Sequence, residues 1–322
     1  MKTPLIEVKD LRKRYPIYGP LGKLFPPKTH MNAVSGLSLQ IYEGETYGLV
    51  GESGCGKTTT GRSILGLTKP EEGEIWYRGK NLVQLSDREF RPLRRDIQMV
   101  FQDPLSSLSP WQRIGALLEE PLRIQGEKDG EKRRDKVLSI LEKVGLSQEH
   151  YFRYPHELSG GQVQRMGIAR ALIIEPKLIV CDEPVSALDV SIQAQILNML
   201  TALQREMGLT LLFISHDMGV VRYLSDRIGV MYLGALVEES TTDELFAGPL
   251  HPYTKALFAS IPDLSKRGKE REMLGGELPV RTDEFKGCVF HTRCPYAEER
   301  CSQEEPVLQE VSPGHKVACH KV

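Results

Sequence analysis

The segment GESGCGKTT at residues 51–59 decides the fold. It follows the short apolar run at 45–50 and satisfies the P-loop pattern G-x-x-x-x-G-K-[ST], with a helix expected from about Lys57. Glycines let the backbone curl so that its N–H groups face a phosphate, and the helix N-terminus adds its dipole. The glycines of this loop are Gly51, Gly54 and Gly56. A strand, a phosphate-binding loop and a helix in this order predict an α/β nucleotide-binding core.

Two side chains of the loop carry the predicted nucleotide chemistry. Lys57 would reach the β- and γ-phosphates, and Thr58 would offer its hydroxyl to Mg²⁺. Ser53 and Thr59 complete the set of loop residues expected to bind the nucleotide. The sequence therefore predicts ATP and Mg²⁺ as cofactors.

An apolar strand ending in two acids, LIVCDE at 178–183, supplies a second part of the predicted site. Such a strand would deliver Asp182 to the carboxyl edge of the sheet, where it can hold Mg²⁺ through water. Glu183 would polarise the attacking water. Strands often end in acidic turns, so this feature alone is weak. Its occurrence in one chain with the P-loop favours the catalytic interpretation.

Two kinds of strand are expected around the core. Period-two alternation predicts half-buried antiparallel strands at 5–8, 37–41 and 74–77, with a basic loop at 16–30. Continuous apolar runs predict buried parallel strands at 45–50, 178–182 and 211–214, alternating with helices such as one at about 161–174. Helix-like spacing between about 86 and 155 predicts a helical insertion.

Charge and hydropathy limit the environments in which the chain is expected to work. The 322 residues carry a net charge of −1, which gives no electrostatic argument for nucleic acid as a partner. No stretch approaches the ~20 apolar residues that span a bilayer, and the N-terminus lacks the apolar core of a signal peptide. We therefore expect a cytoplasmic chain that reaches a membrane only through partner subunits.

Four cysteines crowd the C-terminal tail with the spacing C-x₅-C-x₆-C-x₁₇-C: Cys288, Cys294, Cys301 and Cys319. In a reducing compartment such a cluster indicates a metal site before it indicates disulfides. Four thiolates can close a tetrahedral Zn²⁺ site or hold a [4Fe–4S] cluster, with His291, His315 and His320 as spare ligands. Four buried thiols without a ligand are the remaining alternative.

The segment LSGGQ at 158–162 resembles the signature of the ABC ATPases, and the P-loop, signature and acidic strand occur in that family's order. Three of its residues would cap the following helix and offer a phosphate-binding end: Ser159, Gly160 and Gly161. Gln162 completes the motif. In this family the signature faces the γ-phosphate held by the other subunit. The resemblance therefore implies that one chain supplies half of each of two ATP sites and works as a dimer.

Smaller motifs match the same family. Gln102, in MVFQDP, resembles the glutamine that contacts Mg²⁺ and senses the transmembrane partner. Asp189, in SALD, resembles the residue that crosses the dimer interface, and His216 resembles the switch histidine that contacts the γ-phosphate. Tyr15 lies where the family places a ring under adenine, although Tyr18 or Phe25 could substitute.

Longer segments resemble the F-type ATPases of oligopeptide and dipeptide ABC importers. They are EPVSALDVSIQAQI at 183–196, LHPYTKAL at 250–257, GCVFHTRCPYAEERC at 287–301 and GHKVACH at 314–320. The resemblance implies an α/β, P-loop (RecA-like) ABC ATPase core over 1–245, with an antiparallel β subdomain and a helical subdomain inserted at about 90–165. Residues 246–322 would form a small Cys-rich extension. Members of this family carry an iron–sulfur cluster there, which favours [4Fe–4S] over Zn²⁺.

The same resemblance implies partners and a place of work. They are a second ATPase subunit of the D type, two transmembrane permease subunits and an extracytoplasmic substrate-binding protein, at the cytoplasmic face of the cell membrane. A soluble ABC ATPase with a zinc-binding nucleic-acid or regulatory tail is the alternative. The mixed charges of the tail disfavour it. Within LHPYTKAL, we expect Pro252 to begin a helix that buries Tyr253.

Overall fold

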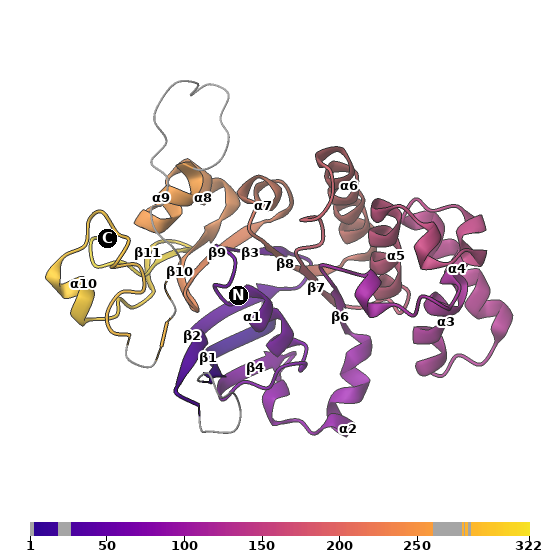
Figure 1. Ribbon diagram of the computed structural model, residues 1–322, viewed down its shortest axis with the longest axis horizontal. Helices are drawn as coiled ribbons and strands as arrows, with labels where there is room; N and C mark the ends of the chain where they lie inside the picture. The colour runs from indigo at the N-terminus through magenta and orange to yellow at the C-terminus, as the bar shows by residue number, and fades with distance from the viewer. Residues whose placement is uncertain (1–2, 19–26, 260–278, 280, 283–284) are drawn as a thin grey trace. The chain divides into compact units, whose positions relative to one another are not determined.

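The computed structural model describes residues 3–18, 27–259, 279, 281–282 and 285–322 (Figure 1). The chain divides into two compact units. The first unit comprises Met1–Tyr42, Thr46–Gln84 and Ile214–Val322, and the second comprises Glu43–Glu45 and Leu85–Phe213. Phe25 and the segment 263–277 lie outside the described residues.

An antiparallel sheet in the first unit has the strand order β2-β1-β4-β5. Its strands are β1 (Pro4–Ile17), β2 (Thr29–Tyr42), β4 (Glu72–Tyr77) and β5 (Lys80–Asn81). Val8 lies opposite Leu39 on one side and opposite Ile75 on the other, and all three side chains are buried. The predicted antiparallel strands are confirmed, although β1 and β2 continue well beyond the alternating runs that predicted them.

The first unit also contributes the neighbouring strands β11-β12-β10-β9-β3. They are β3 (Thr46–Val50), β9 (Arg227–Tyr232), β10 (Ala235–Thr241), β11 (Gln309–Ser312) and β12 (His315–Val317). β3 and β9 run parallel, whereas β10 is antiparallel to both β9 and β12. Every residue of β3 is buried, as expected for a parallel strand covered on both faces. The last strands of the chain thus extend the sheet that contains β3.

Helices in the first unit are mostly short. They are α1 (Lys57–Ile64), α7 (Met218–Leu224), α8 (Thr242–Ala247), α9 (Pro252–Ala259) and α10 (Glu299–Gln303), with a 3₁₀ turn at Leu82–Gln84. α1 begins at Lys57, as predicted. α9 begins at Pro252 and buries Tyr253 completely, which confirms the expectation for LHPYTKAL.

Strands β8-β7-β6 and most of the long helices belong to the second unit. Its strands are β6 (Ile97–Val100), β7 (Leu178–Asp182) and β8 (Thr210–Ser215), the last of which ends across the boundary. Its helices are α2 (Asp87–Phe90), α3 (Ile114–Ile124), α4 (Gly130–Lys143), α5 (Gly160–Leu172) and α6 (Val190–Met207). Short 3₁₀ turns cover Arg91–Arg95, Leu105–Ser107, Gln148–Phe152 and Pro155–Glu157. β6 and β7 pair in parallel.

The stretch expected to be helical contains one strand that the sequence analysis missed. β6 has only four residues, and they pair with β7 from Ile97↔Leu178 to Val100↔Cys181. A run this short carries too little periodicity to be separated from helix-like spacing. These residues form a strand because they pair with β7, a tertiary contact that the local sequence does not encode.

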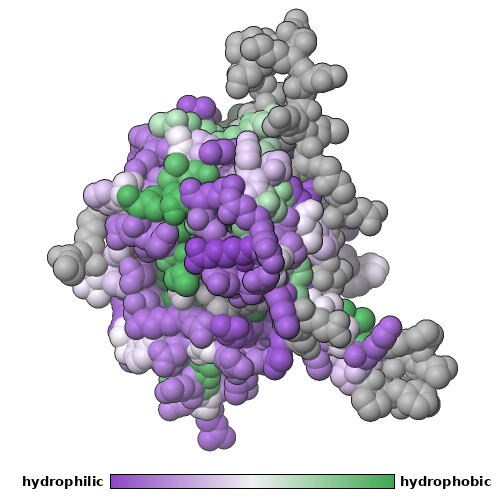
Figure 2. Space-filling model, turned by 90° about the vertical axis from the view of Figure 1, so that its left-hand side faces the viewer, coloured by the Kyte–Doolittle hydropathy of each residue, from purple (hydrophilic) through white to green (hydrophobic). Residues whose placement is uncertain are grey.

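One face of the molecule is drawn by hydropathy in Figure 2. Hydrophilic residues cover most of what is visible there, and hydrophobic residues form smaller patches among them. This agrees with a sequence in which 26% of the residues are charged.

Candidate nucleotide site

The P-loop joins the buried strand β3 to helix α1 in the first unit, as the motif requires. The Lys57 side chain folds back over the loop. Its Nζ donates to the carbonyl oxygens of Gly51, at 2.7 Å, and of Glu52, at 2.9 Å. Lys57 is only 4% exposed. The ammonium group is therefore held inside the curl of the loop, where a phosphate would also be held.

Two glycines of the loop are required by space as well as by backbone angle. A Cβ atom on Gly56, whose φ is +104°, would lie 2.0 Å from the carbonyl oxygen of Ala33. A Cβ atom on Gly51 would lie 2.1 Å from the carbonyl oxygen of Met231. Because both obstacles are backbone atoms, a larger residue would displace the loop. Ser53 and Gly54, with φ +82° at Gly54, are exposed at the tip.

Thr58 and Thr59 lie on the first turn of α1, and both are half-buried. Hydroxyls at this end of a helix are suited to an Mg²⁺–phosphate group, since the helix dipole favours negative charge there. The roles of Thr58 and Thr59 toward Mg²⁺ and phosphate stay predictions.

Glu52, the second residue of the loop, has contacts that the sequence analysis missed. Its backbone N–H donates to the Tyr253 hydroxyl at 2.9 Å. Its carboxylate accepts from both terminal nitrogens of Arg293, at 2.7 and 3.1 Å. These partners lie 201 and 241 positions away in the sequence, so local patterns could not find them. Tyr253 belongs to LHPYTKAL and Arg293 to the cysteine segment, but nothing in the sequence of either segment indicates that it contacts the P-loop.

The acidic end of β7 lies in the second unit. All five residues of β7 are buried, and Asp182 is 4% exposed. Glu183 follows with φ +47°, a left-handed conformation that non-glycine residues seldom adopt. Such backbone strain gathers at functional sites.

Gln102 reaches the same point from the loop after β6. Its Nε2 donates to a Glu183 carboxylate oxygen at 3.3 Å and to the Ser186 hydroxyl at 3.5 Å. Ser186 in turn donates to the Glu183 carbonyl at 3.1 Å. The structure therefore brings together the predicted glutamine, the predicted catalytic acid and the first residue of SALD.

The signature LSGGQ forms the start of α5 in the second unit. Ser159 is the N-cap, and its backbone N–H donates to the Gln162 side-chain oxygen at 3.0 Å. Ser159 and Gly160 are exposed. A Cβ atom on Gly161 would meet Ile192 of α6 at 2.7 Å, so this glycine allows α5 and α6 to pack closely. The expected capped and accessible helix end is present.

The side chains of Asp189, the last residue of SALD, and of His216, which follows β8, are both exposed. Asp189 is the N-cap of α6, and the loop before it is held by Gln193, whose Nε2 donates to the carbonyls of Val185 and Leu188. His216 follows the last residue of β8 directly. Both positions leave the side chains at the surface of the protein.

Tyr15 lies near the end of β1 and is half-buried. The Lys13 Nζ lies 5.5 Å from the centre of its ring, a cation–π distance. Tyr18 follows β1 and is half-buried as well. Of the three candidate rings for adenine stacking, Tyr15 and Tyr18 lie within the described residues and Phe25 does not.

The four cysteines of the tail line one small cavity of the first unit, beside His251 and Phe290. Burial, with a smaller contribution from the charges of the other three cysteines, raises the pKa of the Cys288 thiol to about 11. Burial also raises the pKa of Cys294. The four cysteines therefore line the same cavity, and burial keeps the Cys288 and Cys294 thiols protonated at neutral pH.

The described residues nevertheless form no recognisable metal site. Within the described ranges, no group of three or more Cys, His, Asp or Glu side chains is placed to hold a metal ion. The spare histidines have other contacts: His291 with the Cys288 carbonyl, His320 with the Glu304 carbonyl, and His315 with Glu238. Zn²⁺ ligation that recruits these histidines is therefore disfavoured, and the iron–sulfur cluster stays a prediction.

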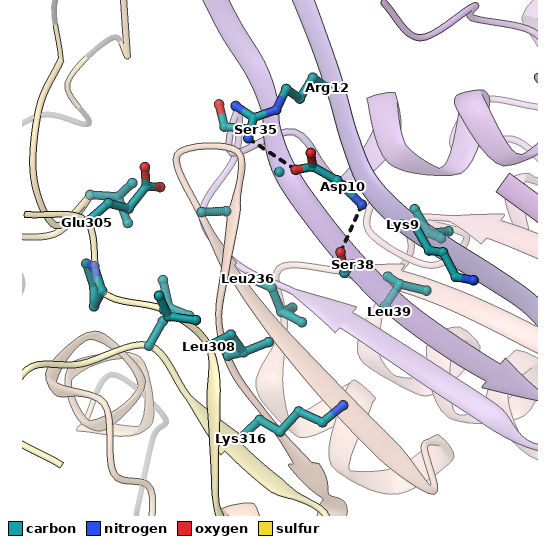
Figure 3. Close-up of a pocket in the computed structure, with 18 of the residues that line it drawn as sticks. Lys9, Asp10, Arg12, Ser35, Ser38, Leu39, Leu236, Glu305, Leu308 and Lys316 are labelled. Atoms are coloured by element: carbon teal, nitrogen blue, oxygen red, sulfur yellow. Dashed lines mark hydrogen bonds and ion pairs between the residues drawn. The ribbon is translucent and has the colours of Figure 1, made fainter. Parts of the chain in front are cut away.

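A larger cavity of about 650 Å³ lies elsewhere in the first unit, beside β1, β2 and the end of the chain (Figure 3). Leu39, Leu236 and Leu308 line it together with charged residues such as Lys316. An ion pair between Arg12 and Asp10, at 3.1 Å, lies at its edge. No P-loop residue lines it, so size alone does not identify the nucleotide site.

A phosphate-binding loop between a buried parallel strand and a helix defines a P-loop nucleotide-binding protein. Residues 34–186 match the family described as "ABC transporter", and residues 237–301 match "Oligopeptide/dipeptide transporter, C-terminal region". The oligopeptide transport ATP-binding protein OppF of Salmonella typhimurium is 54% identical over 326 residues, covering 99% of this chain and 96% of the relative. AppF of Bacillus subtilis, described in the same words, is 50% identical and covers 98% and 97%.

Solved structures agree. The dimeric ABC transporter cassette MJ0796 aligns with a TM-score of 0.65 and 33% identity, covering 74% of this chain and 98% of that cassette. The chain therefore belongs to the ABC transporter family, among the ATP-binding subunits of its oligopeptide and dipeptide importers. The predicted ABC ATPase fold and family are confirmed, and the alternative of a soluble ABC ATPase with a nucleic-acid tail is not favoured. No helix in the part of the chain that the structure describes is long and apolar enough to cross a membrane.

Proposed function

We propose that this chain hydrolyses Mg-ATP to drive peptide import through separate permease subunits. The observation that carries the proposal is the P-loop: a glycine curl that admits no side chain at Gly51 or Gly56, with the Lys57 ammonium held inside it. Near full-length similarity to peptide-transport ATP-binding proteins supports the coupling to import.

The charges of the triphosphate would be met by a small set of residues. Lys57 would contact the β- and γ-phosphates, and Thr58 and Asp182 would hold Mg²⁺, with Gln102 as a further metal contact. The backbone N–H groups at Gly54 and Gly56, with Ser53 and Thr59, surround the phosphates. Their common effect is to stabilise charge that spreads over the γ-phosphate oxygens during in-line attack.

Glu183 is the proposed general base for the attacking water. A carboxylate accepts a proton only if it is oriented toward the water, and the Gln102 contact at 3.3 Å supports such an orientation. His216 contacts the γ-phosphate, and Tyr15 stacks on the adenine ring.

The signature end of α5 would bind the ATP held by a partner cassette. Ser159 and Gly160 are exposed at a helix N-terminus, which suits a phosphate brought by another chain. Gly161 and Gln162 shape that end, and Asp189 contacts the partner across the interface. Head-to-tail dimerisation would then close two shared sites and drive a conformational step in the permease.

The remaining parts of the proposal concern organisation. Residues 1–245 form the nucleotide-binding domain, with a helical subdomain at about 90–165, and residues 246–322 form the extension. The partners are a D-type ATPase subunit, two permease subunits and an extracytoplasmic binding protein, without nucleic acid. The chain works at the cytoplasmic face of the cell membrane, held there by the permeases.

The four-cysteine cavity is the proposed place of a [4Fe–4S] cluster in a structural role. Its support is the convergence of Cys288, Cys294, Cys301 and Cys319 on one cavity. A small tail gains stability from such a staple. Purification under anaerobic conditions should yield iron and absorbance near 400 nm, both lost when Cys301 is replaced by Ser. An iron-free, colourless protein with a fully folded tail would contradict this part of the proposal.

The function as a whole is tested by isolation of the chain from its native cells with an affinity tag. We expect two permeases and a second ATPase to copurify, and we expect peptide-stimulated ATP hydrolysis after reconstitution. Copurification with DNA in a salt-sensitive manner, without permeases, would contradict the proposal.

A further inference from the structure

One acidic residue of the P-loop is held from two sides by the C-terminal part of the chain. We call these interactions the Glu52 contacts: the Tyr253 hydroxyl on the Glu52 backbone N–H, and the Arg293 guanidinium on its carboxylate. Both partners belong to segments after residue 250, within the same compact unit as the loop. The extension therefore touches the loop proposed to bind ATP.

The carboxylate of Glu52 is unfavourable where a polyphosphate must bind, because like charges repel. Arg293 offsets it with two parallel hydrogen bonds, the strongest arrangement available to a carboxylate. The Arg293 side chain is 8% exposed, so solvent screens this pair less than a surface ion pair.

The Glu52 contacts also bear on the position of Lys57. The Glu52 N–H and the Gly51 carbonyl belong to the same peptide group. Its N–H donates to the Tyr253 hydroxyl at 2.9 Å, and its carbonyl accepts from the Lys57 Nζ at 2.7 Å. One peptide group is thus bonded both to the extension and to the phosphate-binding lysine, so a shift of the extension would turn this peptide group and move the lysine.

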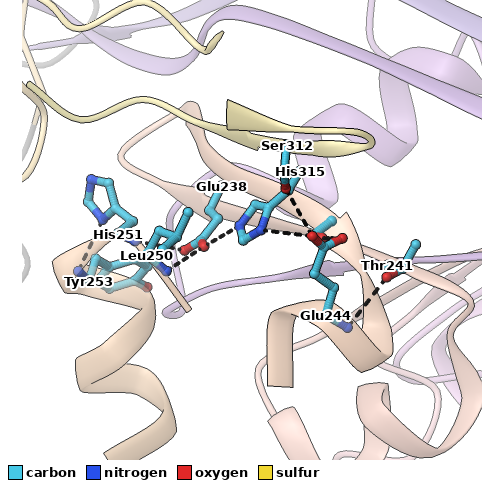
Figure 4. A network of polar contacts seen from close by, with 9 residues as sticks. Glu238, Thr241, Glu244, Leu250, His251, Tyr253, Ser312 and His315 are labelled. Carbon is cyan, nitrogen blue, oxygen red and sulfur yellow. Dashed lines mark hydrogen bonds and ion pairs between the residues drawn. The ribbon is translucent and has the colours of Figure 1, made fainter. Parts of the chain in front are cut away.

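Tyr253 and Arg293 are themselves held firmly. Glu238, with no exposed surface, accepts from the N–H groups of Leu250 and His251 at the start of α9 and contacts His315 Nε2 at 2.8 Å (Figure 4). The Tyr253 ring packs against Phe290, with centres 5.5 Å apart, and Phe290 lies three residues before Arg293. The contacts therefore reach the loop from a buried, hydrogen-bonded support.

We propose that Arg293 and Tyr253 are positioning residues for nucleotide binding, through which the C-terminal extension sets the affinity of the P-loop for Mg-ATP. The inference rests on the proposed nucleotide site. It assigns the extension a task beyond packing: Arg293 neutralises Glu52, and Tyr253 orients the peptide that holds Lys57. Arg293 directly precedes Cys294, so the cysteine cavity is connected to the loop by a single peptide bond and this ion pair.

The test is a titration of the full-length chain with Mg²⁺ and a fluorescent ATP analogue. Arg293→Ala should weaken binding on the order of tenfold, a typical size for coupling between sites. Arg293→Lys should retain part of the affinity, because the charge stays but the two-pronged geometry is lost. Arg300→Ala is the matched control: Arg300 lies in the same extension, pairs with the exposed Glu304 and should leave binding unchanged.

A second substitution separates charge neutralisation from general folding. Glu52→Gln removes the carboxylate, so adding it to Arg293→Ala should restore most of the lost affinity. Unchanged affinity in Arg293→Ala would overturn the inference while leaving the proposed function intact. Equal loss in Arg293→Ala with and without Glu52→Gln would overturn it too, since the loss would then come from the fold of the tail. Failure of the wild-type chain to bind the analogue would overturn both.

Discussion

The P-loop in the first unit and the signature end of α5 in the second are both helix starts shaped to meet phosphate, yet they are held in opposite ways. The P-loop is fixed by residues far away in the sequence, such as Tyr253 and Arg293. The signature is held by a local cap between Ser159 and Gln162, and its tip is exposed. The difference supports the proposal that the chain builds the first half of an ATP site by itself and leaves the second open for another chain.

The largest expected effect concerns hydrolysis. Glu183→Gln removes the proposed general base without removing a phosphate contact, so turnover by the assembled transporter should fall by about a hundredfold or more. The ATP-bound dimer should then persist, and size-exclusion chromatography with ATP should detect it. Wild-type turnover in this variant would remove Glu183 from the mechanism and weaken the contrast between the two regions.

Loss of the P-loop lysine should affect binding in the isolated chain. Lys57→Ala should weaken Mg-ATP affinity by about tenfold or more, since Lys57 is the main positive charge within the curl. Equilibrium titration with a fluorescent ATP analogue measures this. Affinity equal to that of the wild type would mean that the P-loop is not the half-site that the chain builds alone.

Tyr253→Phe removes only the hydroxyl oxygen that accepts the Glu52 N–H, and so tests how much this contact stabilises the protein. The change leaves the ring packing intact but leaves the Glu52 N–H without its hydroxyl acceptor, so the free energy of unfolding should fall by about 1–3 kcal/mol. Chemical denaturation measures the loss. Tyr296→Phe, at an exposed ring, is the control, and equal stability of both variants would show that the Tyr253 hydroxyl does not stabilise the fold.

Acid should loosen the same support. His251 accepts the Tyr253 N–H through Nδ1 at 3.0 Å, and burial lowers its pKa from 6.5 to about 4, with Lys255 acting in the same direction. Because the unfolded chain takes up this proton first, stability falls as the pH drops from about 6.5 toward 4, by up to about 3 kcal/mol.

His251→Asn removes that titration but can keep the cap, since an asparagine oxygen also accepts a helix N–H. Comparison of unfolding free energies at pH 7 and pH 5 should show a smaller loss in this variant than in the wild type. An equal loss in both proteins would assign the acid sensitivity to other groups.

Local chemistry allowed most of the core to be predicted. The residues of the P-loop motif are contiguous in the sequence, so the spacing of its glycines and of Lys57 was enough to predict the strand, loop and helix. The parallel strands β3 and β7 were also readable, because both faces are buried and the apolar runs are continuous. These are the parts in which sequence neighbours are also spatial neighbours.

What could not be predicted depends on distant partners. The four-residue β6 is a strand because β7 lies beside it, and β12 is a strand because β10 does. The contacts of Glu52 with Arg293 join residues 241 positions apart. A single sequence holds no signal for such pairs, since glutamate and arginine are both common on surfaces.

The contrast between the two regions is tested most directly by Ser159→Arg. Ser159 is exposed, so the substitution should leave the fold intact while it blocks the phosphate-binding end of α5. The measurement is ATP hydrolysis by the transporter that carries this variant, read beside the Mg-ATP affinity of the isolated chain. The account predicts loss of hydrolysis with unchanged affinity, because Ser159 and Lys57 serve different ATP molecules. A parallel loss of affinity in the isolated chain, or full hydrolysis by the variant, would contradict it.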